Sequence, residues 1–405
     1  MRFLRVAVTP ADVSGFTNRT ATYSFDRGEE FSITFVHPSA YDDWVADGTD
    51  AWYLLGVASA FASGEDYVHS EAIDAELMRN SRSLVRQWHD FYPGRREIRV
   101  HAAVENAVER ISDEPGLTAC FFTAGVDSSF TLSTRMNDVD VLMLANFNFD
   151  KADGYKFVEP AQTLFVETTS AFKKRAMVIG TNILWPFDAF ADAWSFLTHG
   201  AALAAMGHLF AGKVNRILIS SSHAFGELIP WGSHPLTDPL LASSKLRVEH
   251  VGTTYSRFDK VVTLAGFPEA LQHLAVCGLP PAEKSGLANC SRCQKCLRTM
   301  AALDLCGKIG GDAPSFDWHG YSATALGRVR LHHPNEYIFF EELSVAAEAG
   351  GRFDIADATG TSIRRSRKYK PLVFAENVVR RRFHKVASVK SLKRMKTMFY
   401  GVVRG

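Results

Sequence analysis

Between residues 115 and 221 the sequence alternates strand-like and helix-like segments, and this alternation limits the fold more than any other feature. The strand-like runs are 117–122, 139–146, 176–182 and 214–221. The helix-like stretches between them are 128–136, 159–174 and 188–211. Strands joined in this way by helices form right-handed βαβ units. The sequence therefore predicts an α/β fold with a doubly wound parallel sheet, in which ligands bind beyond the carboxyl ends of the strands.

The first junction between a strand and a helix carries a run of small and hydroxyl-bearing residues. It consists of Thr123, Ala124, Gly125, Val126, Asp127, Ser128 and Ser129. The free amides and the positive dipole end of a helix that begins here would face an anion, and residues without bulk let a ligand approach the backbone. The junction predicts a phosphate-binding loop, and the alternative is an ordinary turn with Asp127 or Ser128 as the helix cap.

Four of the six cysteines lie in one short segment, residues 277–300. They are Cys277, Cys290, Cys293 and Cys296. Two residues between thiols let both bind one ion, and a fourth thiolate completes a tetrahedral site. Disulfides fit poorly because nothing in the sequence suggests export. The segment predicts a structural zinc site, with an iron–sulfur cluster as the alternative; Cys120 and Cys306 are expected to be inert core thiols.

Residues 123–128 resemble the Ser-Gly-Gly-x-Asp-Ser loop of the PP-loop ATP pyrophosphatases, with Thr123 in place of Ser and Ala124 in place of the first Gly. Alanine suits that position only if the backbone there does not need a positive φ. The loop, the later cysteines and the Leu297-Arg298 pair follow one another as in the cyano-deazaguanine synthase family. This resemblance covers about residues 117–305 and implies a Rossmann-like PP-loop domain.

The resemblance also implies a function. In that family the loop binds ATP, a carboxylate is adenylated with release of pyrophosphate, and an amide and then a nitrile form. Carried over, it implies an ATP-dependent, AMP-forming synthase that uses ATP, Mg²⁺ and structural Zn²⁺, with residues 123–129 on the nucleotide and Asp127 and Ser128 in catalysis. The acceptor is then a carboxylate or carbonyl of a small molecule or nucleobase-like substrate. The alternatives are tRNA base thiolation and a non-catalytic nucleotide-binding module.

Four side chains outside the loop are candidates for binding substrate: His223, Asp238, Arg257 and Lys260. His223 could act as a base near neutral pH, as could His234, although a lone loop histidine is more often simply hydrogen-bonded. Asp238 lies in a proline-bounded loop, where an aspartate binds substrate or Mg²⁺ or, more often, backbone amides.

The run Ser256-Arg257-Phe258-Asp259-Lys260 predicts a helix that begins with a capping box. Two of its cations, Arg257 and Lys260, then lie in the first helical turn, where the helix dipole disfavours them. An anionic partner nearby or plain solvation would explain them equally well. Beside the thiolates, Arg292, Lys295 and Arg298 are expected to offset the charge of the metal centre.

The chain is too long for one core, and its charge is unevenly distributed. We expect an N-terminal α+β module at 1–112, the ATP-binding domain with its zinc segment at 113–345, and a basic tail at 346–405. Fourteen Lys and Arg against the single acid Glu376 give residues 361–405 a net charge of +13, so the remainder of a chain with a total of +1 is acidic.

Within residues 1–112 the sequence predicts structure but carries no chemical motif. Turn-forming residues at 26–28 separate two strand-like runs and predict a hairpin. Apolar residues from Leu77 to Trp88 recur at helical spacing and predict an amphipathic helix.

The tail predicts an amphipathic helix of its own. Apolar residues recur every three or four positions, at Phe383, Val386, Val389, Leu392, Met395 and Phe399. Such a helix could dock on the body of the protein or on a second copy in a homodimer, or contact RNA or an anionic membrane. The short apolar run at the N-terminus and the histidine-interrupted run 194–210 do not suggest a signal peptide or a membrane span, so a cytoplasmic protein with reduced thiols is expected.

Overall fold

A computed structural model gives the structure of the chain. It describes residues 1–12, 14–105, 116–147, 162–163, 165–184, 186–277 and 288–383, with the backbone alone at residue 334 and residues 369–383. Of the helix expected at 159–174, residues 159–161 and 164 lie outside these residues, while residues 162–163 and 165–169 are helical. The apolar stripe of the tail beyond Phe383 also lies outside them.

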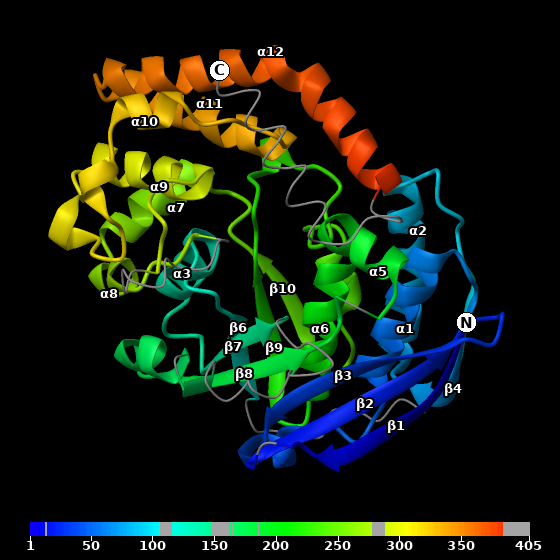
Figure 1. Cartoon of the computed structure of the whole chain (residues 1–405). Coiled ribbons are helices and arrows are strands. Elements are labelled where there is room, and N and C mark those ends of the chain that lie inside the picture. The colour runs from blue at the N-terminus through cyan, green and yellow to red at the C-terminus, as the bar shows by residue number, and fades with distance from the viewer. Residues whose placement is uncertain are drawn as a thin grey trace.

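The described strands form one ten-stranded sheet in the order β10-β9-β6-β7-β8-β3-β2-β1-β4-β5 (Figure 1). Their bounds are β1 Arg2–Pro10, β2 Phe16–Ser24, β3 Glu30–Pro38, β4 Tyr67–Ile73, β5 Val100–Val104, β6 Leu117–Phe121, β7 Val141–Asn146, β8 Arg175–Thr181, β9 Val214–Ser220 and β10 Arg247–Val251. Pairing is antiparallel between β8, β3, β2 and β1 and parallel elsewhere. The predicted α/β fold with a mostly parallel sheet is confirmed.

The described helices cover the sheet and extend beyond it. They are α1 Asp50–Ser63, α2 Ala75–Phe91, α3 Val126–Thr134, α5 Asp188–Ala193, α6 His199–Leu209, α7 Arg257–Ala265, α8 Pro268–Gln272, α9 Gln294–Leu305, α10 Ala323–Gly327, α11 Pro334–Ala349 and α12 Phe353–Phe383. The single helix expected at 188–211 is interrupted by a π-helical turn, Trp194–Thr198.

Both faces of the parallel strands are apolar and buried. In β6, Ala119 and Phe121 join the core formed with α1 and α6. Cys120 and Phe122 join the opposite core, which includes Leu132 of α3. Because neighbouring side chains of a strand point to opposite faces, helices pack against this half of the sheet on both sides.

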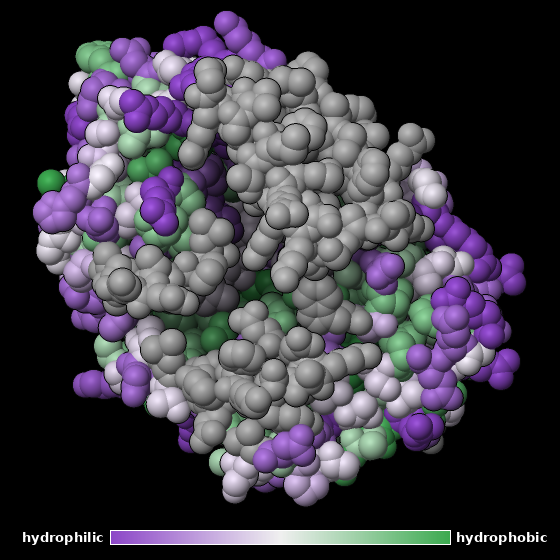
Figure 2. Space-filling view, viewed as in Figure 1, coloured by the Kyte–Doolittle hydropathy of each residue, from purple (hydrophilic) through white to green (hydrophobic). Residues whose placement is uncertain are grey.

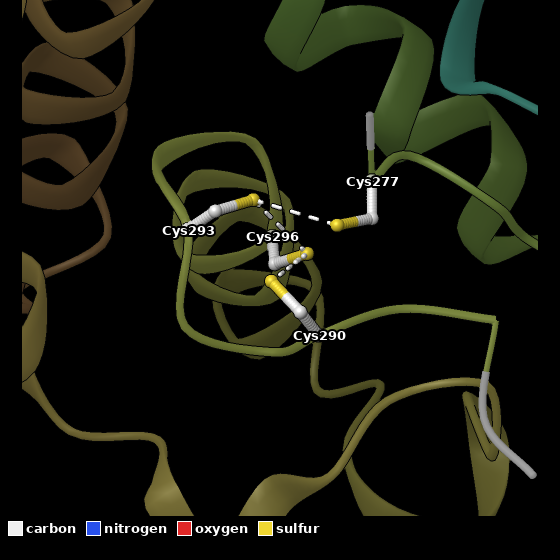
Figure 3. Close-up of side chains that lie close together, drawn as sticks. All are labelled: Cys277, Cys290, Cys293 and Cys296. Carbon is white, nitrogen blue, oxygen red and sulfur yellow. Dashed lines mark hydrogen bonds between the residues drawn. The ribbon is translucent and has the colours of Figure 1, made fainter. Parts of the chain in front are cut away.

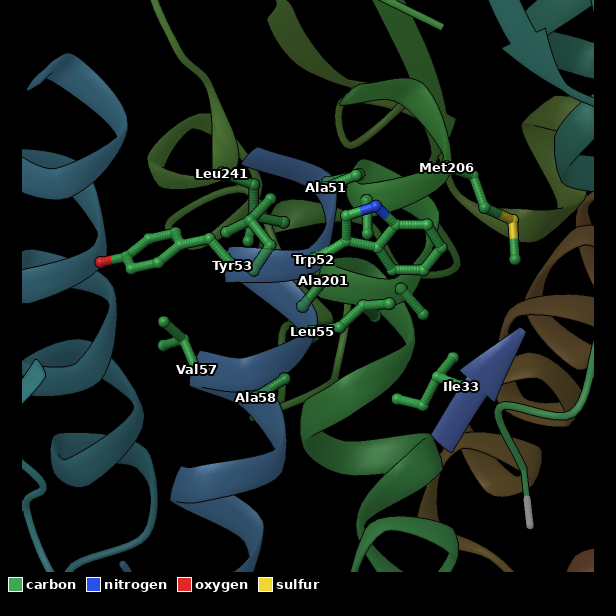
Figure 4. Packing of buried hydrophobic residues seen from close by; sticks show 14 of the residues in the cluster. Ile33, Ala51, Trp52, Tyr53, Leu55, Val57, Ala58, Ala201, Met206 and Leu241 are labelled. Carbon is green, nitrogen blue, oxygen red and sulfur yellow. The ribbon is translucent and has the colours of Figure 1, made fainter. Parts of the chain in front are cut away.

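Helix α1 lies at the centre of the larger core (Figure 4). Every one of its residues except the last is buried, as expected for a helix that is apolar all round. Ala58 and Ala201 are among the small residues where α1 packs against α6, and Trp52 stacks on Phe35 of β3 with the ring centroids 5.1 Å apart. Truncation of a residue such as Leu55 to alanine would cost about 2–5 kcal/mol here.

The sheet continues across the predicted boundary near residue 112. Strand β3 pairs with β8 through Phe35 with Thr181 and Val36 with Gly180. The side chain of Asn182 then extends the ladder: its Oδ1 accepts from the amide of Thr34 at 2.8 Å, and its Nδ2 donates to the carbonyl of Ser32 at 3.1 Å. The strands of the two predicted parts thus share one hydrogen-bonded sheet.

A second group of helices lies beyond the carboxyl ends of the parallel strands. Apolar residues of α7, α9, α10, α11 and α12 form their own cluster. Two serines of α12 secure it, since Ser362 donates to the carbonyl of Val329 at 2.8 Å and Ser366 accepts from the amide of Leu331 at 2.9 Å. This group forms a cover over the strand ends.

The surface is largely polar at its edges. Figure 2 shows hydrophilic residues mainly along the outer margin of the face seen in Figure 1, with hydrophobic residues mainly further in. Of the described helices, none combines the length and the apolar character needed to cross a lipid bilayer.

Candidate functional site

The order of the parallel strands places a crevice between β6 and β9. From β6 the chain adds β7 and β8 on one side, and then β9 and β10 on the other. Ligands of open α/β sheets bind at such a reversal, beyond the carboxyl ends of the two strands. Here these ends lead into the loop at Thr123 and into the segment from Ser221 to His223.

The loop after β6 is closed by its own hydroxyl groups. Ser128 Oγ donates to the carbonyl of Gly125 at 3.2 Å and accepts from the amide of Thr123 at 3.2 Å. Thr123 is exposed, whereas Ser128 and Ser129 are buried. Helix α3 begins at Val126, with Gly125 as its N-cap. The first amides of any helix have no intrahelical acceptor, and here no side chain caps them either.

Ala124 adopts the left-handed backbone conformation, with φ of 54°. The position therefore does need the positive φ for which glycine is suited. A non-glycine residue there costs about 1–2 kcal/mol. Its methyl group is buried in the cluster with Phe122 and Leu132, and its carbonyl accepts from the amide of Ala275 at 2.7 Å, so the alanine packs into the core instead of covering the loop.

Asp127 is the anionic partner of the two cations in the first turn of α7. Arg257 Nη2 lies 2.8 Å from Asp127 Oδ2, and Lys260 Nζ lies 3.1 Å from Oδ1. The capping box of Ser256 and Asp259 is present and fixes this turn. Burial alone would raise the pKa of Asp127, but the charges of Arg257 and Lys260 outweigh it and lower that pKa.

Lys260 also reaches the second strand end. It is 1% exposed, and its Nζ donates to the carbonyl of Ser221 at 2.5 Å. Burial lowers the pKa of Lys260, and Asp127 opposes this shift. Because each oxygen of Asp127 faces a cation, this carboxylate positions Lys260 and Arg257.

Arg298 of α9 does not lie against the thiolates, as the sequence suggests, but over the ring of Phe339 in α11. Its guanidinium carbon is 4.4 Å from the ring centroid, and that of Arg257 is 4.8 Å from the same centroid. Burial, and then the charge of Arg257, lower the pKa of Arg298 to about 9. Together with Lys260, these side chains give the crevice more positive charge than Asp127 neutralises.

His223 lies beside the same aromatic ring. It is 4% exposed and stacks on Phe339 with centroids 5.8 Å apart, with Trp231 edge-on at 6.0 Å. Within the described residues neither ring nitrogen has a hydrogen-bond partner. Burial, followed by the charge of Arg257, lowers its pKa to about 4, so the ring is neutral at pH 7.

Two glutamates that the sequence did not single out complete this region. Glu342 of α11 accepts from the amide of Phe258 at 3.2 Å. Burial and the neighbouring Glu227 raise the pKa of Glu342 to about 8. At neutral pH, Glu342 is therefore mostly protonated and neutralises little of the nearby positive charge.

Asp238 and His234 belong to a separate buried network. Asp238 is fully buried: its Oδ2 accepts from Ser233 at 2.6 Å and from His250 at 2.7 Å, and its Oδ1 accepts from the amide of His234 at 3.0 Å. The ring of His234 accepts from the amide of Leu236 at 3.1 Å. This geometry favours a structural role for both residues.

The four clustered cysteines converge as a metal site requires (Figure 3). Their sulfurs all lie within 4.8 Å of one another, with separations of 3.8 Å for Cys277–Cys293, 3.8 Å for Cys290–Cys296 and 3.5 Å for Cys293–Cys296. Tetrahedral zinc with Zn–S bonds of about 2.3 Å separates its sulfurs by about 3.8 Å. The cluster could therefore hold a metal ion such as zinc.

A buried asparagine holds the two halves of this cluster together. Asn289 Oδ1 accepts from the amides of Val276, at 2.8 Å, and Cys277, at 3.2 Å, while its Nδ2 donates to the carbonyl of Leu274 at 2.7 Å. Between the ligands, Ser291 has φ of 55°, which turns the chain from Cys290 back towards the start of α9. Away from the cluster, burial raises the pKa values of Cys120, to about 12, and of Cys306.

Comparison of the chain with protein-family models, with curated proteins and with solved structures found no match.

Proposed function

We propose that the junction between β6 and α3 binds the phosphates of ATP, in the manner of a PP-loop, and that the chain is an AMP-forming synthase. The observation that carries this proposal is the excess of positive charge at a strand-order reversal, around a helix start that no side chain caps. A helix N-terminus combined with basic side chains is a general phosphate site.

The proposed chemistry is attack on the α phosphorus with departure of pyrophosphate. Its main requirement is in-line positioning and neutralisation of the charge that grows on pyrophosphate. Lys260 and Arg257 are suited to this task because Asp127 and the carbonyl of Ser221 hold them beside the loop. A Mg²⁺ ion that accompanies the nucleotide would be held by the phosphates.

The cysteine cluster supports a structural role for zinc. Four thiolates leave no open coordination position for water or substrate. A tRNA-thiolating enzyme needs a reactive persulfide-bearing cysteine or an accessible cluster, so the geometry of the sulfurs favours the synthase over this alternative. The acceptor is proposed to be a small molecule that carries a carboxylate or carbonyl group.

The test uses α,β-methylene-ATP, which cannot lose pyrophosphate, in calorimetric binding titrations. In Gly125→Ala the added methyl lies 3.3 Å from Thr123 Oγ1 and 3.7 Å from the carbonyl of Ala275, and φ at this residue is −78°, so the backbone tolerates it. The methyl crowds the approach to the amides, and we expect binding about tenfold weaker or more, a loss of about 1.4 kcal/mol or more.

The control is Gly350→Ala, at the end of α11, where φ is −85° and the nearest atom to an added methyl is 3.4 Å away. It should bind the analogue like the wild type. A wild-type protein that binds no analogue would refute the proposed nucleotide site. If it binds ATP but releases no pyrophosphate with any carboxylate tested, the chain is a binding module and not a synthase.

A further inference from the structure

We propose that Arg298, together with the unpaired edge of Arg257 above Phe339, binds an oxyanion of a ligand, either a carboxylate of the acceptor or a phosphate of the nucleotide. This inference rests on the proposed function, because it assigns a binding group to the same crevice. It adds a residue, Arg298, that the sequence motifs do not connect with the substrate.

The first argument is the pairing of the two arginines. Arg257 forms an ion pair with Asp127 through Nη2, but its Nε is buried and has no acceptor among the described residues. Arg298 has neither an ion pair nor a side-chain hydrogen bond within the part of the chain that the structure describes; its contact is with Phe339. A contact of this kind is worth about 0.5–2 kcal/mol.

That stabilisation is small compared with the several kcal/mol that an ion loses on leaving water. Two guanidinium groups over one ring also repel each other. An anion bound between or beside them would relieve both effects. Arginine suits carboxylate and phosphate oxygens because its donors form a planar fork.

His223 gives an independent indication of a ligand. It is nine-tenths or more buried, it stacks on the same ring, and both of its nitrogens lack partners among the described residues. Buried polar groups normally have hydrogen-bond partners. The neutral imidazole offers one donor and one acceptor, so it can bind a polar group of the same ligand that presents its oxyanion to Arg298.

The available space limits how the ligand enters. A cavity of about 10 Å³ lies between Arg257, Arg298, Phe339 and Glu342, with apolar residues of α7, α9 and α11 around it. This is room for about one water-sized atom. One oxygen of the anion could therefore occupy it, while the body of the ligand stays outside, towards the strand ends.

The experiment compares wild-type protein, Arg298→Gln and Arg298→Lys in titrations with two probes, benzoate as a planar carboxylate and α,β-methylene-ATP as a phosphate source. We expect Arg298→Gln to weaken the binding of one probe about tenfold or more. Arg298→Lys should restore part of this affinity, because lysine keeps the charge but lacks the planar fork of donors. The weakened probe identifies the source of the oxyanion. The matched control is Arg328→Gln, which removes the same charge from an exposed arginine. It should leave the affinity for both probes unchanged.

Zinc content and urea unfolding will show that each variant is folded. A second measurement uses the wild type alone: phenylglyoxal, which modifies arginine, should label Arg298, and the effective probe should protect it, as read by peptide mass spectrometry. Unchanged affinity for both probes in Arg298→Gln, or no binding of either by the wild type, would overturn the proposal.

Failure of the two proposals can be told apart. If the nucleotide analogue does not bind but benzoate binds through Arg298, the proposed ATP site fails and the oxyanion site stands. If Gly125→Ala weakens binding of the nucleotide analogue while Arg298→Gln changes the affinity for neither probe, the ATP site stands and the oxyanion site fails.

Discussion

The ammonium group of Lys260 lies 3.1 Å from Oδ1 of Asp127 and 2.5 Å from the carbonyl oxygen of Ser221. One buried side chain of α7 thus joins the first turn of α3, which follows the loop after β6, to the residue after the end of β9. The two strand ends that border the crevice are held together by this contact, so its loss should affect stability as well as binding.

Asp127→Asn is expected to lower the free energy of unfolding by about 3 kcal/mol, because it leaves Lys260 and Arg257 partly buried without their anion. Urea titrations measure this. The double variant Asp127→Asn/Lys260→Met should cost at least about 1 kcal/mol less than the sum of the single variants. For comparison, Glu341→Gln removes the exposed pair with Arg367 and should cost less than about 1 kcal/mol. Additive effects at Asp127 and Lys260 would contradict the contact.

The left-handed backbone at Ala124 leads to a prediction about glycine. Ala124→Gly relieves a strain of about 1–2 kcal/mol, which roughly offsets the lost methyl burial and the added freedom of the unfolded chain. Ala205→Gly, at a fully buried position within α6, has no such compensation. Urea unfolding should therefore show Ala124→Gly to be at least about 1 kcal/mol less destabilising than Ala205→Gly. Equal losses would rule out the strained conformation.

Zinc binding can be tested with two cysteines that lie at opposite ends of helix α9, Cys293 before its first residue and Cys306 after its last. Cys293→Ser should lose most of the metal, and it should destabilise the helices around α9 by several kcal/mol, on the order of 3 or more. Cys306→Ser, at the end of α9 and outside the cluster, should keep one zinc ion per chain. Metal analysis by mass spectrometry and thermal unfolding give both results. Full zinc content in Cys293→Ser would refute the four-thiolate site.

Glu342 predicts a dependence of stability on pH. Burial and Glu227 raise its pKa from the usual 4.5 to about 8, so between these values the folded chain holds a proton that the unfolded chain has released. Its contribution to stability is therefore complete below pH 4.5 and is lost as the pH rises towards 8. Glu342→Gln cannot ionise and should gain about 1 kcal/mol or more relative to the wild type between pH 5 and pH 8.

Unfolding titrations at several pH values check this gain. Glu348→Gln, an exposed site on the same helix, is the matched control, and the gain of Glu342→Gln between pH 5 and pH 8 should exceed that of Glu348→Gln. A pH-independent difference between Glu342→Gln and the wild type would show that Glu342 is ionised in the folded chain.

The features that the sequence predicted are those encoded by neighbouring residues. The amphipathic helix at 77–88 became α2, and the turn at 26–28 joins β2 to β3, because the periodicity and the turn chemistry are both local. The thiolate cluster was predictable for the same reason, since three of its four ligands lie within seven residues.

The environment of the crevice could not be predicted in this way. Phe339 and Glu342 come from α11, far along the chain from the loop, and no local pattern indicates that this helix covers α7 and α9. The charge of Arg298 suggested a partner of the thiolates, but the helix turns it towards Phe339. The anionic partner of Arg257 and Lys260 was expected only as a class, and the structure identifies it as Asp127.

The short antiparallel pairing between β3 and β8, continued by the side chain of Asn182, has a consequence for truncated forms of the protein. Removal of the first hundred residues would leave the backbone donors and acceptors of β8 facing solvent along an open margin. Such margins recruit strands from other molecules. Expression of the remaining part, which contains the proposed nucleotide site, should therefore yield self-associating material, whatever chemistry the intact chain performs.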